Sequence, residues 1–214
     1  MKQFTQWSYS QANCWLQCPR RAKLSYIDKV PQGPPSEALV RGSAIHKEAE
    51  DFLRGKGKDV PASLFLFSKH LIGLRKRKVN VELMWAFNRK WEPVDPYGPD
   101  RWLKVILDVH YKTGKTHTIG DWKTGKVRNE DHQKQLGLYA LGAMILGAKV
   151  VHTELWYVDH GKTFKDTYEA SEMGEMKAQW ERIVNFMEAD TIFAPKPNRL
   201  CNWCPYHGTP HCEF

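Results

Sequence analysis

Three ionisable residues stand on two apolar segments joined by a short turn, and their types and spacing could support chemistry. Asp108 interrupts the segment "VILDVHY", and Asp121 and Lys123 end the next segment, "THTIGDWK". A lone buried carboxylate costs free energy unless it has a partner or binds a metal. Residues two apart on a strand point to the same side, so Asp121 and Lys123 should project together. A hairpin turning at Gly114 would bring Asp108 near both.

The two carboxylates would form a site of hard oxygen ligands, which suits Mg²⁺ or Mn²⁺. Such an ion can hold a phosphate and activate a water molecule. The ammonium of Lys123 would offer positive charge to the phosphate or the attacking hydroxide. If burial and the nearby metal cation lower its pKa, this lysine could also assist proton transfer. The same spacing fits a structural Asp–Lys ion pair at a strand end, so spacing alone leaves both interpretations open.

Two further pairs of polar residues have helical spacing. His46 and Glu50 lie four residues apart in "RGSAIHKEAE", and Gln135 and Tyr139 lie four apart in "HQKQLGLYA". Residues with this spacing share one face of a helix. A satisfied histidine and an amphipathic helix with Tyr139 in the core are the plain alternatives, so each pair is weak evidence by itself.

The order of the predicted elements is helices, three strands, a helix, two strands and a helix. Ser10 and Ser36 are candidate helix caps, and Pro19 should break the first helix near Cys18. This order predicts an α/β domain with a mixed sheet, followed by an irregular tail at 193–214. The predicted helices cover 11–27, 36–53, 62–77, 129–146 and 171–190, and the predicted strands cover 79–87, 101–111, 116–123, 150–159 and 163–170.

The bulk composition fits one basic domain over residues 1–214. A chain of 214 residues with 42% hydrophobic residues can build one core. A formal net charge of +8 favours a polyanionic partner, although a merely soluble basic protein has the same property. The N-terminus lacks the apolar core of a signal peptide, and no apolar run approaches the length of about 18 residues that a membrane helix needs. We therefore expect a cytoplasmic protein.

Five cysteines in a reducing compartment favour metal ligation over disulfide bonds. Three of them, Cys201, Cys204 and Cys212, lie together in "CNWCPYHGTPHC". His207 and His211 lie in the same segment, so a local zinc site is one possibility.

Several short motifs, taken together and in order, resemble the PD-(D/E)XK nuclease superfamily and its RecB-like branch in particular. That branch includes CRISPR-associated adaptation nucleases, nuclease domains of bacterial recombination helicases and small phage-type exonucleases. The resemblance covers nearly the whole chain and implies a restriction-endonuclease-like core, in which helices flank a mixed central sheet. The motifs are "SYSQANCWLQCPRR", "RGSAIHKEAE", "ILDVHY", "IGDWKTGK", "QLGLYA" and the C-terminal cysteines.

The resemblance assigns roles to the residues of the candidate site. It implies that His46, Asp108 and Asp121 bind Mg²⁺ or Mn²⁺, and that the backbone carbonyl of Trp122 is a further ligand. It implies that Lys123 is the catalytic lysine. The remaining assignments are that Gln135 and Tyr139 support Lys123 or contact the DNA backbone, and that Glu50 and Glu82 are secondary, metal-linked acids.

The resemblance also implies a role for the cysteines. In the resembling family, one cysteine near the N-terminus joins three near the C-terminus to hold a four-iron, four-sulfur (4Fe-4S) cluster. Cys18 stands at the matching N-terminal position and would join Cys201, Cys204 and Cys212. Residues 1–29 and 196–214 would then form a cap on a nuclease core at 30–195. Structural zinc is the alternative.

The activity that the resemblance implies is metal-dependent hydrolysis of DNA phosphodiester bonds, by an exonuclease in preference to an endonuclease. The expected setting is recombination or repair in a prokaryote or a phage-infected cell, with linear ends or single strands as substrate and a homo-oligomer or a partner protein as possible assemblies. The alternatives are a CRISPR-associated adaptation nuclease and a non-catalytic DNA-binding or assembly subunit. Basic residues could contact phosphates or form a solvated face; the candidates are Arg20, Arg21, Arg75, Lys76, Arg77 and Lys78.

Overall fold

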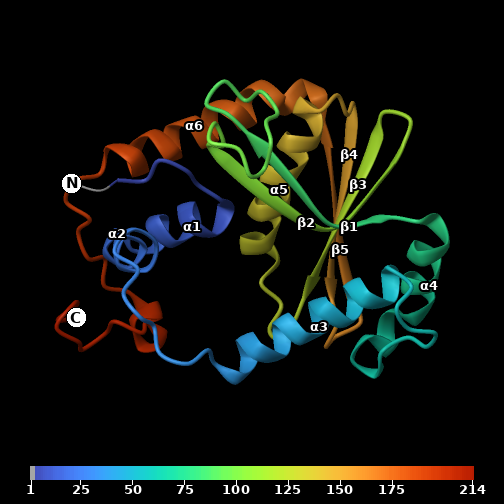
Figure 1. Cartoon of the computed structure of the whole chain (residues 1–214), viewed down its shortest axis with the longest axis horizontal. Coiled ribbons are helices and arrows are strands. Elements are labelled where there is room, and N and C mark those ends of the chain that lie inside the picture. The colour runs from blue at the N-terminus through green and yellow to red at the C-terminus, as the bar shows by residue number, and fades with distance from the viewer. Residues whose placement is uncertain (1–2) are drawn as a thin grey trace.

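The computed structural model describes residues 3–214, except for the side chains of residues 129–131. Its centre is a five-stranded mixed sheet in which the strands follow chain order (Figure 1). Strands β3 and β4 are parallel, and the other neighbours are antiparallel. The strands are β1 (Asn80–Phe87), β2 (Leu103–Thr113), β3 (Thr116–Lys123), β4 (Val150–Tyr157) and β5 (Lys162–Glu169).

The β2–β3 hairpin forms as predicted. Thr113 pairs with Thr116, and Gly114 between them has a φ of +59°, which glycine adopts without steric cost. Val109 pairs with Gly120. One residue further along each strand stand Asp108 and Asp121, so the register of the hairpin brings the two acids side by side.

The parallel pair β3–β4 requires a crossover, and helix α5 (Asn129–Ile145) provides it. The register runs from Thr116 opposite Val150 to Lys123 opposite Tyr157. Both strands therefore end at the same edge of the sheet, and the segments that follow Lys123 and Tyr157 meet there.

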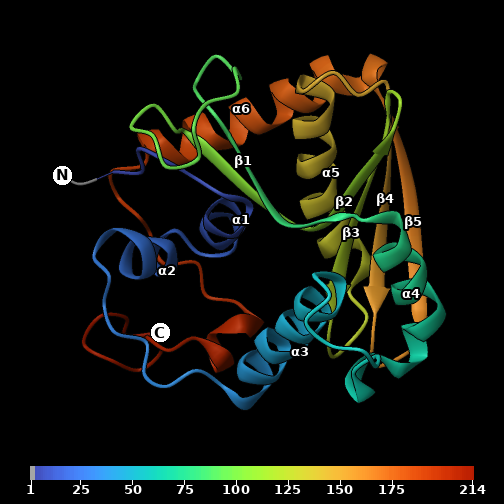
Figure 2. The same cartoon turned by 45° about the vertical axis from the view of Figure 1, so that its right-hand side comes forward.

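Helices cover both faces of the sheet (Figures 1 and 2). Helices α3 (Glu37–Leu53) and α4 (Ser68–Arg77) pack on one face, where Ile45, Phe52 and Leu71 join Trp122 and Trp156 in a buried cluster. Helices α5 and α6 (Met173–Ala189) cover the other face. This arrangement is the α/β core with a flanked mixed sheet that the sequence predicted.

The N-terminal helices lie beside the C-terminal tail (Figure 2). Helix α1 (Tyr9–Gln17) stops at Cys18, and α2 (Pro19–Ala22) starts at the proline that was expected to break the helix. Long-range hydrogen bonds join the two regions: Trp15 Nε1 donates to Asp190 Oδ2 at 2.9 Å, and Arg20 Nε donates to the Phe193 carbonyl at 3.1 Å.

Helix termini differ in detail from the predictions. Ser36 caps α3 as expected, since its Oγ accepts the Leu39 N–H at 3.3 Å. Ser10 is not a cap, because α1 begins at Tyr9 after an extended Ser8. The segments Ala62–Phe67 and Ala170–Glu172 are 3₁₀ turns that precede α4 and α6. Within the described residues, no helix combines the length and the apolarity needed to cross a bilayer.

Candidate active site

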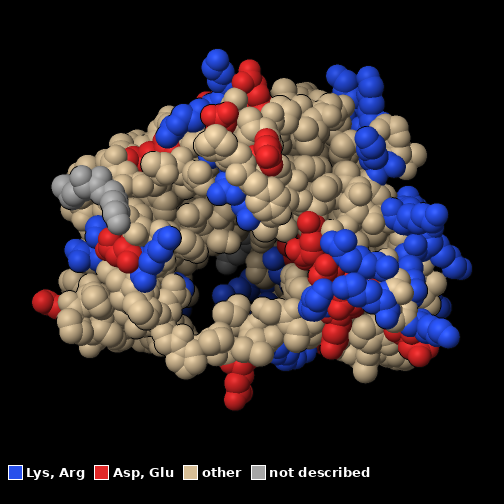
Figure 3. Space-filling view, in the orientation of Figure 1, with Lys and Arg blue, Asp and Glu red and all other residues tan. Residues whose placement is uncertain are grey.

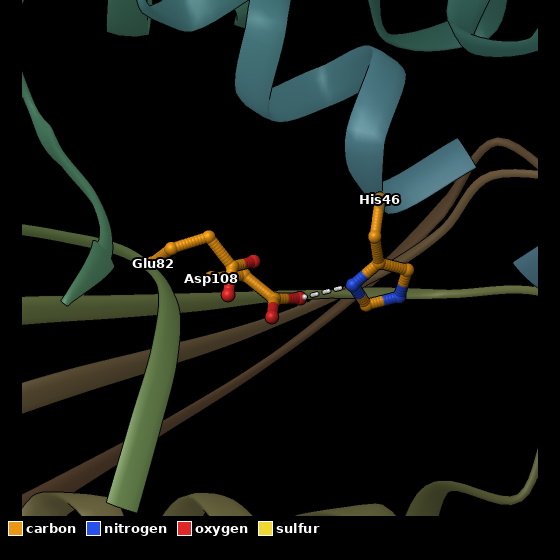
Figure 4. A group of neighbouring side chains, drawn as sticks. All are labelled: His46, Glu82 and Asp108. Atoms are coloured by element: carbon orange, nitrogen blue, oxygen red, sulfur yellow. Dashed lines mark ion pairs between the residues drawn. The ribbon is translucent and has the colours of Figure 1, made fainter. Parts of the chain in front are cut away.

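Three side chains from three elements converge on one point: His46 of α3, Glu82 of β1 and Asp108 of β2 (Figure 4). Each offers a ligand atom, and these atoms all lie within 4.8 Å of one another. His46 Nδ1 is 3.1 Å from Asp108 Oδ2. Among the residues that the structure describes, this is the one such group of three or more His, Cys, Asp or Glu side chains.

Backbone geometry places Glu82 in this group. Its neighbours Val81 and Leu83 pair with Val109 and Leu107, so Glu82 stands across from Asp108. The φ of Glu82 is +52°, in the left-handed region that residues other than glycine rarely adopt. Such local strain persists where the surrounding structure imposes it, often at functional sites.

The protonation of His46 and Glu82 responds to the crowding of charge. Burial raises the pKa of Glu82, and the neighbouring Asp108 carboxylate raises it further. Burial alone would lower the pKa of His46, but the hydrogen bond to Asp108 and its charge outweigh burial, so the pKa is raised. The raised pKa means that the Asp108 carboxylate favours a proton on His46. One imidazole and two carboxylates also suit Mn²⁺ or Mg²⁺, so these residues fit the metal that the sequence resemblance implies.

Asp121 and Lys123 form a buried ion pair beside this group. Lys123 Nζ lies 2.6 Å from Asp121 Oδ2, which confirms that the two side chains share one side of β3. Burial raises the pKa of Asp121 despite the nearby ammonium. Burial would lower the pKa of Lys123, but Asp121 outweighs it and the net pKa is raised. This direction holds for the protein without a metal ion, and a role of Lys123 in proton transfer beside a bound cation stays a prediction.

Helix α5 orients the lysine. Lys123 Nζ donates a hydrogen bond to Gln135 Oε1 at 3.0 Å, and Gln135 Nε2 donates to the Tyr139 hydroxyl at 2.7 Å. Burial raises the pKa of Tyr139, which keeps that hydroxyl protonated. The four-residue spacing of Gln135 and Tyr139 on α5 thus allows a chain of hydrogen bonds that runs from the Lys123 ammonium to the Tyr139 hydroxyl.

Trp122 contributes through its backbone N–H. That N–H donates to Asp108 Oδ2 at 2.9 Å, while the indole ring is buried in the cluster under α3 and α4. The sequence led us to expect the Trp122 carbonyl as a metal ligand, and that role stays a prediction. The hydrogen bond from its N–H fixes one oxygen of Asp108, which already faces His46.

Two predicted acids lie outside the group of three. Asp121 pairs with Lys123, and Glu50 pairs with Lys47 at 3.0 Å and with Arg54 at 2.8 Å. Glu50 nevertheless lines an open cavity of about 530 Å³, which the group of three also lines. The wall of that cavity also includes Gly42, Ser43, His46, Glu82, Asp108, Lys123, Thr124 and His132.

Sequence reasoning missed His132. Its Nδ1 lies 2.6 Å from the hydroxyl of Tyr157, the last residue of β4, and its side chain lines the cavity. The sequence did contain a signal for this residue: His132 precedes Gln135 by three residues, so the two share one side of helix α5.

The basic residues proposed for DNA contact are partly engaged within the protein. Arg75 donates to the Gly57 carbonyl at 2.7 Å and lies over the Phe52 ring, and Arg77 lies over the Tyr111 ring. Figure 3 shows Lys and Arg side chains gathered on the side of the molecule where α4 lies. A surface of this kind suits phosphate contact, and the role of its residues stays a prediction.

The four cysteines that were assigned to a cluster line one cavity, together with Arg20 and Arg21. Backbone N–H groups of Lys196 and Asn198 donate to Cys18 Sγ and Cys201 Sγ, each at 3.4 Å. None of the five cysteines forms a disulfide bond, and burial raises the pKa of the fifth, Cys14, to about 11.

The spacing of these thiols bears on which metal they could hold. Among the described cysteines and histidines of this region, no three ligand atoms come within 4.8 Å of one another. A single zinc ion with bonds of about 2.3 Å would need sulfur atoms about 3.8 Å apart. A zinc site and an iron–sulfur cluster at these residues both stay predictions.

Comparison with known proteins places the chain in a family. The sequence profile of the PD-(D/E)XK nuclease superfamily matches residues 6–209, so the chain belongs to that superfamily. The solved structure described as "Crystal structure of SSO0001" is similar in fold, with a TM-score of 0.53 and 13% identity over 96% of this chain and 86% of that one. No curated protein matches the chain.

Proposed function

We propose that the protein is a Mg²⁺- or Mn²⁺-dependent deoxyribonuclease that hydrolyses phosphodiester bonds, acting on linear DNA ends or single strands as an exonuclease. Membership of the superfamily makes it a nuclease by class. The observation that carries the finer proposal is the meeting of His46, Glu82 and Asp108 beside the charged Lys123.

The residues of the site divide into those that would hold the ion and those that act on the phosphate. His46, Glu82 and Asp108 would hold the ion, with Asp121 beside them. A bound divalent cation supplies Lewis-acid activation of the phosphate and of a water molecule. The ammonium of Lys123, kept charged by Asp121 and aimed by Gln135, stabilises negative charge that grows on the phosphate oxygens in the transition state.

The preference for an exonuclease in recombination or repair, in a phage or a prokaryote, rests on coarser features. The chain has no sequence-reading motif, and a +8 protein suits the DNA backbone in general. Arg20, Arg21 and the basic end of α4 would supply phosphate contacts.

Cleavage of matched substrates tests the proposal. Labelled linear and circular DNA are incubated with Mg²⁺ or Mn²⁺, with the Asp108→Ala variant as control. We expect the wild type to degrade linear DNA and spare circles, and the variant to lose at least about 100-fold in rate, the scale at which electrostatic transition-state contacts act. Cutting of both substrates would mean an endonuclease, and no cutting with either metal would favour a non-catalytic DNA-binding subunit.

We further infer that Cys18, Cys201, Cys204 and Cys212 hold a 4Fe-4S cluster with a structural role. Their shared cavity and the two backbone N–H donors to sulfur support this inference. Hydrogen bonds to sulfur are a common feature of such sites. The neighbouring Arg20 and Arg21 would offset the charge of four thiolates.

A further inference from the structure

The first two turns of α3 are held to the protein in an unusual way. Residues 37–41, 43 and 44 are all exposed, and the first buried residue of the helix is Ile45. The apolar side chains in this part face solvent, with Leu39 61% and Val40 54% exposed. Apolar packing therefore fixes only the part of α3 that begins beside His46.

An ion pair holds the exposed part. The guanidinium of Arg41 contacts both carboxylate oxygens of Asp159, with 3.0 Å between one terminal nitrogen and Oδ2 and a shorter contact to Oδ1. Asp159 stands two residues after the end of β4, at the edge of the sheet where β3 ends on Lys123. This fork-like geometry is the most directional of the ion pairs that proteins use.

Asp159 also holds the loop that follows Lys123. Its Oδ2 accepts the Gly125 N–H at 2.7 Å. The Gly125 carbonyl, which can only accept, takes a hydrogen bond from His160 Nε2 at 2.9 Å. Both polar groups of Gly125 are thus held by consecutive residues of the β4–β5 turn. Gly125 has a φ of +75°, so a side chain here would strain the loop.

The helix and the loop touch directly. A Cβ added to Gly42 would lie 3.2 Å from the Thr124 hydroxyl, and both residues line the cavity of the active site. Arg41 lowers the pKa of Asp159 to about 2, with help from the Gly125 N–H, so the carboxylate is charged at any working pH. One carboxylate therefore links the element that carries His46 to the loop behind Lys123.

We propose that Asp159 is a positioning residue for the metal site. By binding both Arg41 and Gly125, it holds the first two turns of α3 against the Thr124–Gly125 loop and keeps His46 directed at Asp108. This inference rests on the proposed function. Without the ion pair, the first two turns of α3 lose their link to the Thr124–Gly125 loop, the helix is held less firmly at His46, and metal affinity falls while the packed core is unchanged.

Measurements of Mn²⁺ binding on three variants distinguish the contact of Asp159 with Arg41 from its contact with Gly125. Mn²⁺ affinity is measured by electron paramagnetic resonance titration on Arg41→Ala, Asp159→Asn and Asp159→Ala, with thermal melting and the KM and kcat for DNA as companion measurements. Arg41→Ala breaks only the helix contact, and Asp159→Asn keeps an acceptor for Gly125. We expect each to weaken Mn²⁺ binding about fivefold, the scale of one exposed ion pair. Asp159→Ala should weaken it further, with kcat at saturating Mn²⁺ within about twofold of wild type.

A matched ion pair provides the control. The Arg89 guanidinium likewise contacts both carboxylate oxygens of Glu188, with nitrogen–oxygen distances of 2.8 and 3.0 Å. Arg89→Ala should leave Mn²⁺ affinity unchanged. The proposal is overturned if Asp159→Ala binds Mn²⁺ within twofold of wild type, if it melts lower with unaltered affinity, or if the wild type binds no Mn²⁺. A wild type that binds Mn²⁺ but cuts no DNA contradicts the nuclease activity alone.

Discussion

At the scale of single residues, the carboxylates of the site differ in their surroundings and so in what they can do. Asp108 receives the Trp122 N–H and faces His46, and Glu82 completes that group. Asp121 is 3% exposed and pairs with Lys123, where burial penalises its charge. In the protein without metal, Asp121 is engaged with Lys123, while Asp108 and Glu82 are more open; the roles of all three as metal ligands stay predictions.

His110, a buried histidine two residues after Asp108 on β2, should contribute to how stability depends on pH. His110 is 4% exposed, its Nε2 is 3.1 Å from His117 Nδ1, and burial lowers its pKa to about 4. The unfolded chain, with an ordinary pKa of about 6.5, binds the proton more readily. The contribution of His110 to stability is therefore full above pH 6.5 and should fall by on the order of 2 kcal/mol as the pH drops toward 4; the raised pKa of Asp121 acts in the opposite direction, so the contribution is read from the difference between wild type and His110→Gln.

Urea unfolding at a series of pH values between 7 and 4.5 measures this slope. His110→Gln should flatten it, with a residual slope from His117, whose pKa burial also lowers. The exposed His152 offers a control, since His152→Gln should keep the wild-type slope. An equally steep loss of stability in His110→Gln would show that other groups govern the acid sensitivity.

At the scale of elements, the contact between β3 and β4 depends on a missing side chain. A Cβ added to Gly120 would lie 1.8 Å from the ring of Trp156, which packs across β3. Because β3 is hydrogen-bonded on both sides, its backbone cannot move away. Gly120→Ala should therefore destabilise the protein by about 3 kcal/mol, the upper range for overpacking.

A second glycine gives the matched control for chemical denaturation. Gly73 lies inside helix α4, and a Cβ there would meet nothing within 4 Å. Gly73→Ala should stabilise the protein by about 0.5–1 kcal/mol, because alanine is the better helix former. Equal effects of the two substitutions would mean that the Trp156 ring moves aside freely.

At the scale of the whole molecule, Cys18 lies next to a tail that is almost the full chain length away. The backbone of Lys196 hydrogen-bonds its sulfur, and Asn198 Nδ2 donates to the Gln17 carbonyl. A cluster here would close nearly the entire chain into one loop, and crosslinks over long loops stabilise mainly by restricting the unfolded state. The predicted cap thus depends on a bond between its two parts.

Cys18→Ala should abolish iron binding and lower the melting temperature, whereas Cys14→Ala should retain both iron and colour. The measurements are iron and sulfide analysis of protein prepared without oxygen, absorption near roughly 400 nm, and thermal melting. If Cys18→Ala keeps its metal content and its melting temperature, and that metal is zinc, the local site at the C-terminal cysteines and histidines replaces the cluster.

The sequence alone was sufficient for the parts of the site that are local. Alternation put Asp121 and Lys123 on one side of a strand, the turn at Gly114 paired Asp108 with them, and helical spacing aligned Gln135 with Tyr139. These relations follow from the two-residue period of strands and the 3.6-residue period of helices, which any window of sequence displays.

Only the tertiary structure decided the rest. Glu82 joins Asp108 through the pairing of β1 with β2 and a left-handed backbone, and Asp159 reaches Arg41 across 118 residues. The raised pKa of Lys123 likewise depends on the competition between burial and a paired carboxylate. Desolvation and charge depend on which groups surround a side chain in space, and elements far apart in the chain supply those groups.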